Sequence, residues 1–216
     1  SVRSEPVFRE TGCWGVAEGA ALAAAGPEGR LLVPKRKGQG VTAAVALAGR
    51  GLDPGAIGRP QGELAVVGLG PGGPAWRTAE AERRLAAAED LVGYGLYLDL
   101  IGPAAAGKTR HEFPLGAETE RCRFALELAA TGRRVALVCS GDPGIYAMAT
   151  LVFELLDPAA EPSWARVAVT VCPGVSALQG AAALAGAPLG HDFCAISLSD
   201  LMTPAATILR RVQAAA

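Results

Sequence analysis

The stretch Leu64-Ala-Val-Val-Gly-Leu-Gly-Pro-Gly-Gly73 runs from four apolar residues directly into a glycine-rich turn. The same order, an apolar run and then a turn, recurs at Ser140-Gly-Asp-Pro-Gly144 and at Cys172-Pro-Gly-Val-Ser-Ala177. We name these the first turn (68–73), the second turn (140–144) and the third turn (172–177). In an open α/β sheet such turns follow the carboxyl ends of the strands, where ligands bind. Together they predict one ligand pocket at that edge.

The order of elements around the turns predicts the fold class. Strands are expected at Leu64–Val67, Leu91–Val92, Val135–Cys139, Val167–Val171 and Phe193–Leu198. Helices are expected at Thr78–Glu89, at Glu118–Ala130, from Asp142 to Leu156, in an Ala-rich stretch ending at Gly186, and after Thr203-Pro204. This alternation is typical of parallel sheets with right-handed crossovers. We therefore predict an α/β fold with a mostly parallel five-stranded sheet flanked by helices.

Two units and a linker are expected along the chain. Residues 1–48 form a small partial α/β unit, with a helix at Val16–Ala25 and strands at Leu31–Val33 and Val41–Leu47. Residues 49–62 contain five glycines and two prolines, a composition typical of a linker. Residues 63–216 form the predicted α/β domain.

Composition argues against several classes of protein. Half of the 216 residues are hydrophobic, which is enough for a packed core. Twenty basic residues balance twenty-one acidic ones, so no nucleic-acid or anionic membrane surface is indicated. The five cysteines form no CxxC pair, so neither disulfides nor a metal site is expected. Without a long apolar stretch or a signal-peptide pattern, we expect a cytoplasmic protein and no membrane contact.

The first turn matches the dinucleotide pattern G-x-G-x-x-G, but two features argue against NAD. Pro71 and Pro74 remove amide donors that a pyrophosphate needs. The second strand also ends in Gly93-Tyr94-Gly95 instead of the acid that would hold a ribose. A tight turn without any ligand stays open as an alternative.

Polar residues of the other two turns allow a structural and a functional interpretation. Asp142 followed by Pro143 fits a helix N-cap, and Ser176 fits the N-cap of the next helix. The backbone groups of Ser140 and Gly141 would suit a ligand that carries hydroxyls, an amine and a carboxylate. Both interpretations stay open at this point.

Four motifs carry a family resemblance. Val67-Gly-Leu-Gly-Pro-Gly72, Ser140-Gly-Asp-Pro-Gly-Ile-Tyr146, Pro173-Gly-Val-Ser-Ala177 and Gly186-Ala-Pro-Leu-Gly-His-Asp-Phe193 resemble the tetrapyrrole (precorrin) methyltransferase family, in particular its members that methylate C-17 of precorrin-3B. The resemblance covers about residues 63–216. Residues 10–48, with Thr11-Gly-Cys-Trp-Gly-Val-Ala-Glu18, resemble the C-terminal domain of the lactone-opening, acetaldehyde-releasing enzyme of cobalamin biosynthesis.

The resemblance implies S-adenosylmethionine as methyl donor and a precorrin as acceptor, in C-17 methylation with ring contraction. Another ring position, or a catalytically incomplete docking fragment, is the alternative. Carried over by motif, the donor neighbours are Gly70, Pro71, Ser140, Gly141, Asp142, Ile145, Ser176 and Ala177, and the positions of proposed proton-transfer groups are Tyr94 and Lys108. Family members add a second α/β domain. We therefore expect a fragment of a longer fusion protein, a homodimer when complete.

Overall fold

A computed structural model describes Glu5, Arg9, Ile57 and residues 15–53, 61–156, 161–199 and 203–215. The chain divides into two compact units, residues 1–59 and 60–216. The Thr11–Trp14 part of the N-terminal motif lies outside the described residues, as do 54–56 and 58–60 of the expected linker.

Within residues 15–53, the N-terminal unit has one helix and one hairpin. Helix α2 spans Val16–Ala25, as predicted, and ends at Gly26, whose φ of 79° suits a residue without Cβ. Strands β1 (Arg30–Lys37) and β2 (Thr42–Leu47) pair antiparallel. The carboxylate of Glu18, buried on α2, accepts a hydrogen bond from the backbone N–H of Lys35 at 3.1 Å and so ties the helix to β1.

The second unit is built on a five-stranded sheet in the order β5-β4-β6-β3-β7. The strands are β3 (Glu63–Gly68), β4 (Asp90–Tyr94), β5 (Thr109–Phe113), β6 (Arg134–Cys139) and β7 (Ala168–Cys172). Every neighbouring pair is parallel, which confirms the predicted fold class.

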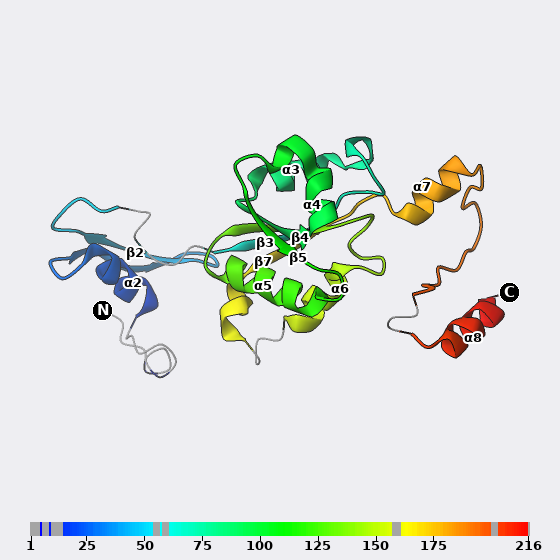
Figure 1. Ribbon diagram of the computed structural model, residues 1–216. Helices are drawn as coiled ribbons and strands as arrows, with labels where there is room; N and C mark the ends of the chain where they lie inside the picture. The colour runs from blue at the N-terminus through cyan, green and yellow to red at the C-terminus, as the bar shows by residue number, and fades with distance from the viewer. Residues whose placement is uncertain are drawn as a thin grey trace. The chain divides into compact units, whose positions relative to one another are not determined.

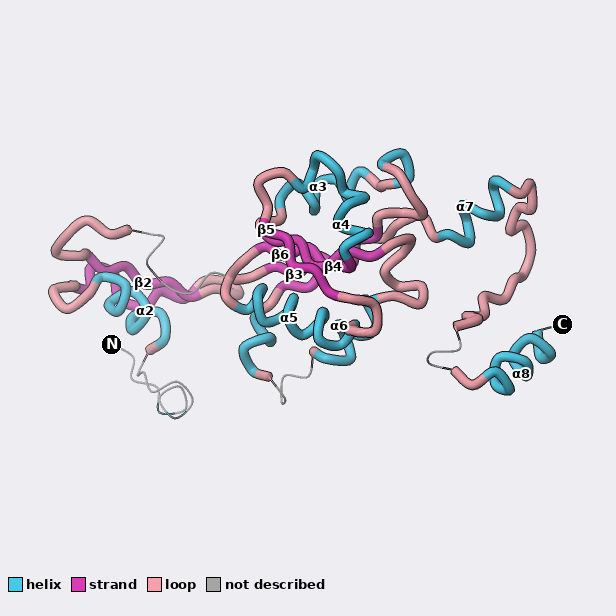
Figure 2. Tube along the Cα trace, viewed as in Figure 1, coloured by secondary structure: helices cyan, strands magenta, loops and turns pink. Residues whose placement is uncertain are grey.

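Helices cover both faces of this sheet (Figures 1 and 2). One face packs against α5 (Glu118–Ala130) and α6 (Met148–Leu155), with the short turn Pro162–Arg166. The other face packs against α3 (Ala79–Ala87), α4 (Gly95–Ile101) and the turn Gly102–Ala105. The apolar residues of β3 alternate between the two layers: Leu64 and Val66 contact the first, Ala65 and Val67 the second.

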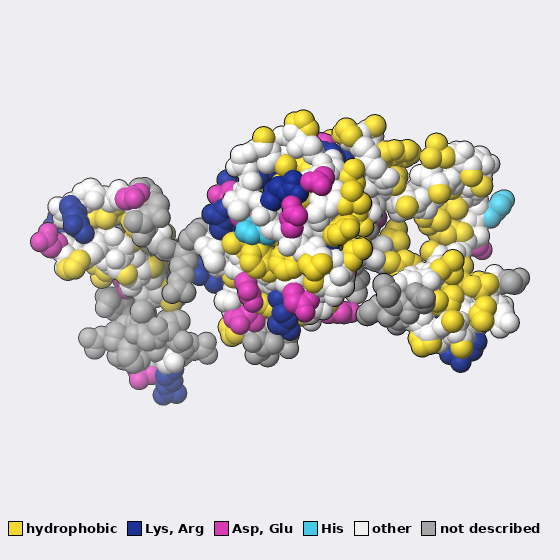
Figure 3. Space-filling model, in the orientation of Figure 1, with side chains coloured by type: hydrophobic (Ala, Val, Ile, Leu, Met, Phe, Trp, Pro, Cys, Tyr) yellow, Lys and Arg dark blue, Asp and Glu magenta, His cyan; other side chains and the backbone are white. Residues whose placement is uncertain are grey.

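Helices α7 (Ala177–Leu184) and α8 (Ala205–Ala215) lie in the C-terminal segment 177–215. Many of its apolar side chains are exposed, among them Leu184, Phe193, Leu198 and Leu209, and apolar side chains are prominent there in Figure 3.

Two expected elements differ from the structure. Residues 193–198 form no strand, because no strand among the described residues pairs with them and an isolated strand leaves its backbone groups unbonded. The fifth strand is β5 instead, which the sequence reasoning missed. Its Thr-Arg-His-Glu-Phe sequence is polar because β5 is an edge strand with a partly exposed face.

The helix expected from Asp142 begins six residues later, at Met148, so Asp142 is not its N-cap. The backbone of Tyr146 has a φ of 50°, which a right-handed helix cannot contain. Residues 142–147 therefore form a loop at the carboxyl edge.

Candidate functional site

The three turns follow three adjacent strands, β6, β3 and β7, at their carboxyl ends. The first and second turns are joined by a pair of backbone hydrogen bonds. Gly70 N–H donates to Gly141 O at 3.2 Å, and Gly141 N–H donates to Gly70 O at 2.9 Å. The predicted convergence of the turns is therefore confirmed.

The meeting of the first and second turns coincides with a topological switch point. The chain leaves β3 for α3 on one face of the sheet and leaves β6 toward α6 on the other face. After α3 the chain continues to β4, and after α6 it continues to β7, which lies toward the opposite end of the strand order. Ligands of open α/β sheets bind in the opening that such divergence leaves.

Three glycines allow the turns to approach at backbone contact. A Cβ on Gly68 would lie 2.5 Å from Gly141 O and 2.9 Å from Gly174 N, and a Cβ on Gly174 would overlap Gly141 O. Gly70 has a φ of 76°, and a Cβ there would lie 2.7 Å from both Cβ and O of Trp76. A side chain at Gly68 or Gly174 would force the turns apart, and a side chain at Gly70 would clash with Trp76.

Two side chains tie the third turn to the others. The carboxylate of Asp142 accepts from Gly144 N–H at 2.8 Å through Oδ1 and from Gly174 N–H at 3.1 Å through Oδ2. The hydroxyl of Thr78, which follows the first turn, donates to Pro173 O at 3.3 Å and accepts from Ala81 N–H at 3.1 Å. The sequence reasoning used Thr78 only as the start of a helix and missed this contact.

The eight predicted donor neighbours divide into two groups. Pro71, Ser140, Ile145 and Ala177 are exposed at the strand tips. The others are engaged within the protein: Gly70 pairs with Gly141, Asp142 binds two amides, and Ser176 is buried. Ser176 caps α7 in a reciprocal capping box with Gln179, so its structural interpretation is confirmed.

The structure does not bring Tyr94 and Lys108 together. Tyr94 ends β4 at the carboxyl edge, next to the tip of β6, and its ring packs edge-on against Tyr97 at 5.4 Å between centroids. Lys108 precedes β5 at the opposite, amino edge. Its ammonium donates to Ala86 O at 2.9 Å and Ala88 O at 2.7 Å, at the C-terminal end of α3. The proton-donor role inferred by resemblance for Lys108 finds no support in this placement.

A buried ion network lies toward the amino edge. Asp90, 2% exposed, binds His111 Nε2 at 2.9 Å and Arg133 Nε at 2.5 Å. Burial by itself raises the pKa of the Asp90 carboxyl. Hydrogen bonds and charge from Arg133 and His111 outweigh that effect and hold the pKa below its ordinary value. This cluster is far in register from the three turns, which supports a structural role for His111.

The cysteine at the end of β6 lies directly before the second turn but does not suit nucleophilic chemistry. Burial raises the pKa of the Cys139 thiol to about 11, and burial raises that of Cys122 to about 12. Both thiols therefore stay protonated near neutral pH and contribute to the core as small apolar groups.

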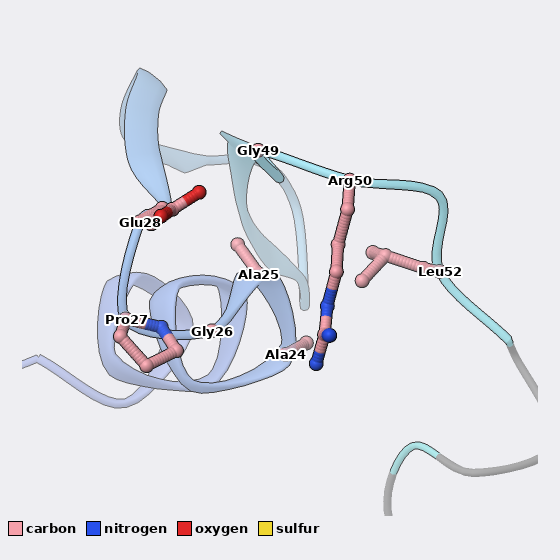
Figure 4. Close-up of a pocket in the computed structure, with 8 residues that line it drawn as sticks. All are labelled: Ala24, Ala25, Gly26, Pro27, Glu28, Gly49, Arg50 and Leu52. Carbon is pink, nitrogen blue, oxygen red and sulfur yellow. The ribbon is translucent and has the colours of Figure 1, made fainter.

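Two surface hollows contain none of the predicted site residues. One, of about 350 Å³, belongs to the N-terminal unit, where Arg50 extends along one side and Glu28 stands across from it (Figure 4). The other, of about 290 Å³, lies between Pro74, Arg77 and the end of α4. Neither hollow is lined by a residue of the three turns, so we place the candidate site at the turns on the geometry of the sheet. Among the residues that the structure describes, no helix could cross a bilayer and no side-chain cluster could hold a metal ion.

Comparison with known families gives two matches. The model of the tetrapyrrole (corrin/porphyrin) methylases matches residues 63–216, and that of the cobalamin synthesis G C-terminus matches residues 1–46. Both resemblances inferred from the motifs are therefore confirmed.

Curated relatives and a solved structure match the same region. A probable cobalt-factor III C(17)-methyltransferase of Salmonella typhimurium is 47% identical over 152 residues, which are 70% of this chain and 61% of the relative. A precorrin-3B C(17)-methyltransferase of Sinorhizobium sp is 43% identical over 155 residues, 72% of this chain and 60% of the relative. The cobalamin biosynthesis protein CobIJ of Mycobacterium tuberculosis is 48% identical over 155 residues, 72% of this chain and 29% of the relative.

The crystal structure of the methyltransferase CobJ superimposes with a TM-score of 0.65 at 46% identity, covering 70% of this chain and 62% of that one. The chain thus spans less than two thirds of the length of each of these proteins.

Proposed function

The chain belongs to the tetrapyrrole (corrin/porphyrin) methylase family, and from this premise we propose that it binds S-adenosylmethionine at the three turns for methyl transfer to C-17 of a corrin precursor. The observation that carries the proposal is the switch point where Gly70 and Gly141 pair. The names of the relatives support C-17 of a precorrin or cobalt-factor intermediate as the acceptor position. The match of residues 1–46 to a second cobalamin-synthesis family supports the same pathway.

The residues at the turns fit the proposed donor. The absence of side chains at Gly68 and Gly174 brings the backbones of the three turns into contact, so their peptide groups lie close together at the sheet edge. Ser140 and Ala177 are exposed beside this contact, and Ile145 offers an exposed apolar side chain against which the adenine of the donor can pack. Pro71 stiffens the first turn without offering an amide, which disfavours a pyrophosphate ligand.

Positioning is the main contribution of this chain to the chemistry. The bound donor supplies a methyl group on a positively charged sulfur, in line with an electron-rich ring carbon. Rigid placement of two reactants in that geometry supplies a large part of a rate enhancement. The turns are rigid because backbone hydrogen bonds and the Asp142 carboxylate connect all three. Tyr94, at the neighbouring tip of β4, is our proposal for the acceptor side. The homodimer and the cytoplasmic location stay predictions.

Isothermal titration calorimetry with S-adenosylhomocysteine tests the donor proposal on the 216-residue chain. We expect saturable binding of one equivalent, and no binding of NADH in a parallel fluorescence titration. Absence of binding at millimolar S-adenosylhomocysteine would contradict the proposal, and saturable NADH binding would favour an oxidoreductase. Methylation of precorrin-3B with labelled donor, analysed by mass spectrometry, tests the acceptor and the ring position.

A further inference from the structure

Both carboxylate oxygens of Asp142 are bound within the protein, unlike those of a side chain that points toward a ligand. Each of its two carboxylate oxygens already accepts a backbone N–H: Oδ1 from Gly144, two residues along, and Oδ2 from Gly174, 32 residues along. The first bond shapes the second turn, and the other one fixes the third turn to it. The side chain is half-buried between them.

The third turn depends on this connection because it lies at van der Waals limits against its neighbours. The Cα of Gly174 faces Gly141 O and the carbonyl of Gly68 so closely that a methyl group would not fit. The bond from Gly174 N–H to the Asp142 carboxylate holds the third turn in this close position. Charge-assisted bonds of this kind are about twice as strong as neutral ones.

We propose that Asp142 is a positioning residue for donor binding, which acts through Gly174 and holds the third turn in register with the other two. This inference rests on the proposed function, because it concerns the same site. The carboxylate sets the distance between Ser140 on one turn and the Ser176–Ala177 start of α7 on the other. The binding site is then preorganised, and the turns do not have to be ordered when the donor binds.

The variant Asp142→Asn tests this role with little change in size. The Asn side chain has one oxygen and one NH₂ group. Its oxygen can keep one of the two hydrogen bonds, but its NH₂ group then faces the second backbone N–H, and two donors cannot form a bond. We expect S-adenosylhomocysteine to bind about 10- to 100-fold more weakly, the loss typical of a hydrogen bond to a charged group. Far-UV circular dichroism confirms the fold before titration.

Ligand analogues separate positioning from direct contact. Because a displaced turn affects the whole opening, the fold-loss should be the same for S-adenosylhomocysteine, for methylthioadenosine, which lacks the amino-acid part, and for the 2′-deoxy analogue. A loss that disappears when one ligand group is removed would show that Asp142 binds that group, and would overturn the proposal. Asp142→Glu keeps the charge but moves it, so restored affinity in that variant would overturn it as well.

Amide hydrogen exchange provides a readout that needs no ligand. The Gly174 amide should be protected in the native chain and should exchange at least 10-fold faster in Asp142→Asn, while core amides of β3 and β6 keep their protection. Unchanged exchange at Gly174 would contradict the positioning role of Asp142. This result does not depend on whether the chain binds S-adenosylmethionine. The matched control is Glu161→Gln, since Glu161 accepts from the N–H of Ser163 at 3.3 Å before β7, at the amino edge. This control should leave both ligand affinity and Gly174 exchange unchanged.

Discussion

The two edges of the five-stranded sheet are stabilised by different kinds of groups. At the carboxyl edge, backbone amides and carbonyls of Gly70, Gly141 and Gly174 make most of the connections. At the amino edge, charged side chains make them: Asp90 binds His111 and Arg133, and Lys108 binds the end of α3. Asp142 is an ionisable side chain at the carboxyl edge, and both of its partners are backbone amides. The comparison teaches that a cluster of ionisable side chains does not by itself mark the candidate site in this domain.

Gly70→Val should have the largest effect, because it breaks the carboxyl edge. The new side chain would meet Trp76 and would force a β-branched residue to a φ of 76°. We expect a loss of about 3 kcal/mol in the free energy of unfolding and more than about 100-fold in S-adenosylhomocysteine affinity. Urea unfolding and calorimetry measure the two quantities.

Gly107→Val is the matched control for this variant. Its φ is 74°, but no atom lies within 4 Å of a Cβ there, and it precedes β5 at the amino edge. It should cost about 1–2 kcal/mol in stability and nothing in donor affinity. Equal losses of affinity in both variants would show that backbone strain, and not the first turn, controls binding.

Asp90→Asn should show the opposite pattern, because it breaks the amino edge. The variant loses the charged acceptor that Arg133 and His111 bind, so we expect the free energy of unfolding to fall by about 2 kcal/mol, measured by urea unfolding. Donor affinity should stay within about twofold of the native value. A large loss of affinity without a loss of stability would contradict the separation of the two edges.

The pH dependence of stability should report the same carboxyl group. The pKa of Asp90 is lower in the folded chain than its ordinary value of 3.8, so the folded state favours the ionised form. Its contribution is fully present above pH of about 4 and is lost as pH falls through the lowered folded pKa. Urea unfolding between pH 2.5 and 7 should show a smaller acid-dependent decrease for Asp90→Asn than for the native chain. Identical profiles would rule out this carboxyl group as a source of the decrease.

Lys108→Met should have the smallest effect and tests the amino-edge position of Lys108. Its ammonium binds two carbonyls at the end of α3, so removal should cost about 0.5–1 kcal/mol in stability. Donor affinity and methyl transfer should be unchanged. Loss of methyl transfer with unchanged stability would restore the proton-donor interpretation and contradict the placement described above.

Prediction from sequence succeeded where local rules decide the structure. The helix Glu118–Ala130 was predicted to the residue, and the three turns were found from their apolar runs and glycines. It failed where tertiary partners decide. Residues 193–198 have an apolar pattern but no neighbouring strand in the described part of the chain, whereas the polar β5 pairs with β4.

Asp142 shows why the site could be predicted only in part. Aspartate followed by proline is a local pattern typical of a helix N-cap, and the helix was expected to begin there. Asp142 instead binds two amides: Gly144 N–H is local, but Gly174 N–H lies on another turn and leaves no local pattern in the sequence. Residue types therefore predicted members of a candidate site, and the hydrogen bonds of the structure show which of them contact one another.

The pairing of Gly70 with Gly141 also bears on how such a protein can diverge. A bond between two peptide groups is insensitive to the identity of the residues around it, provided that both glycines persist. Side chains on the proposed acceptor side, such as Tyr94 at the tip of β4, can then be exchanged during evolution without loosening this contact. Under the proposed function, a lineage could thereby change the molecule it modifies while its hold on the methyl donor stays the same.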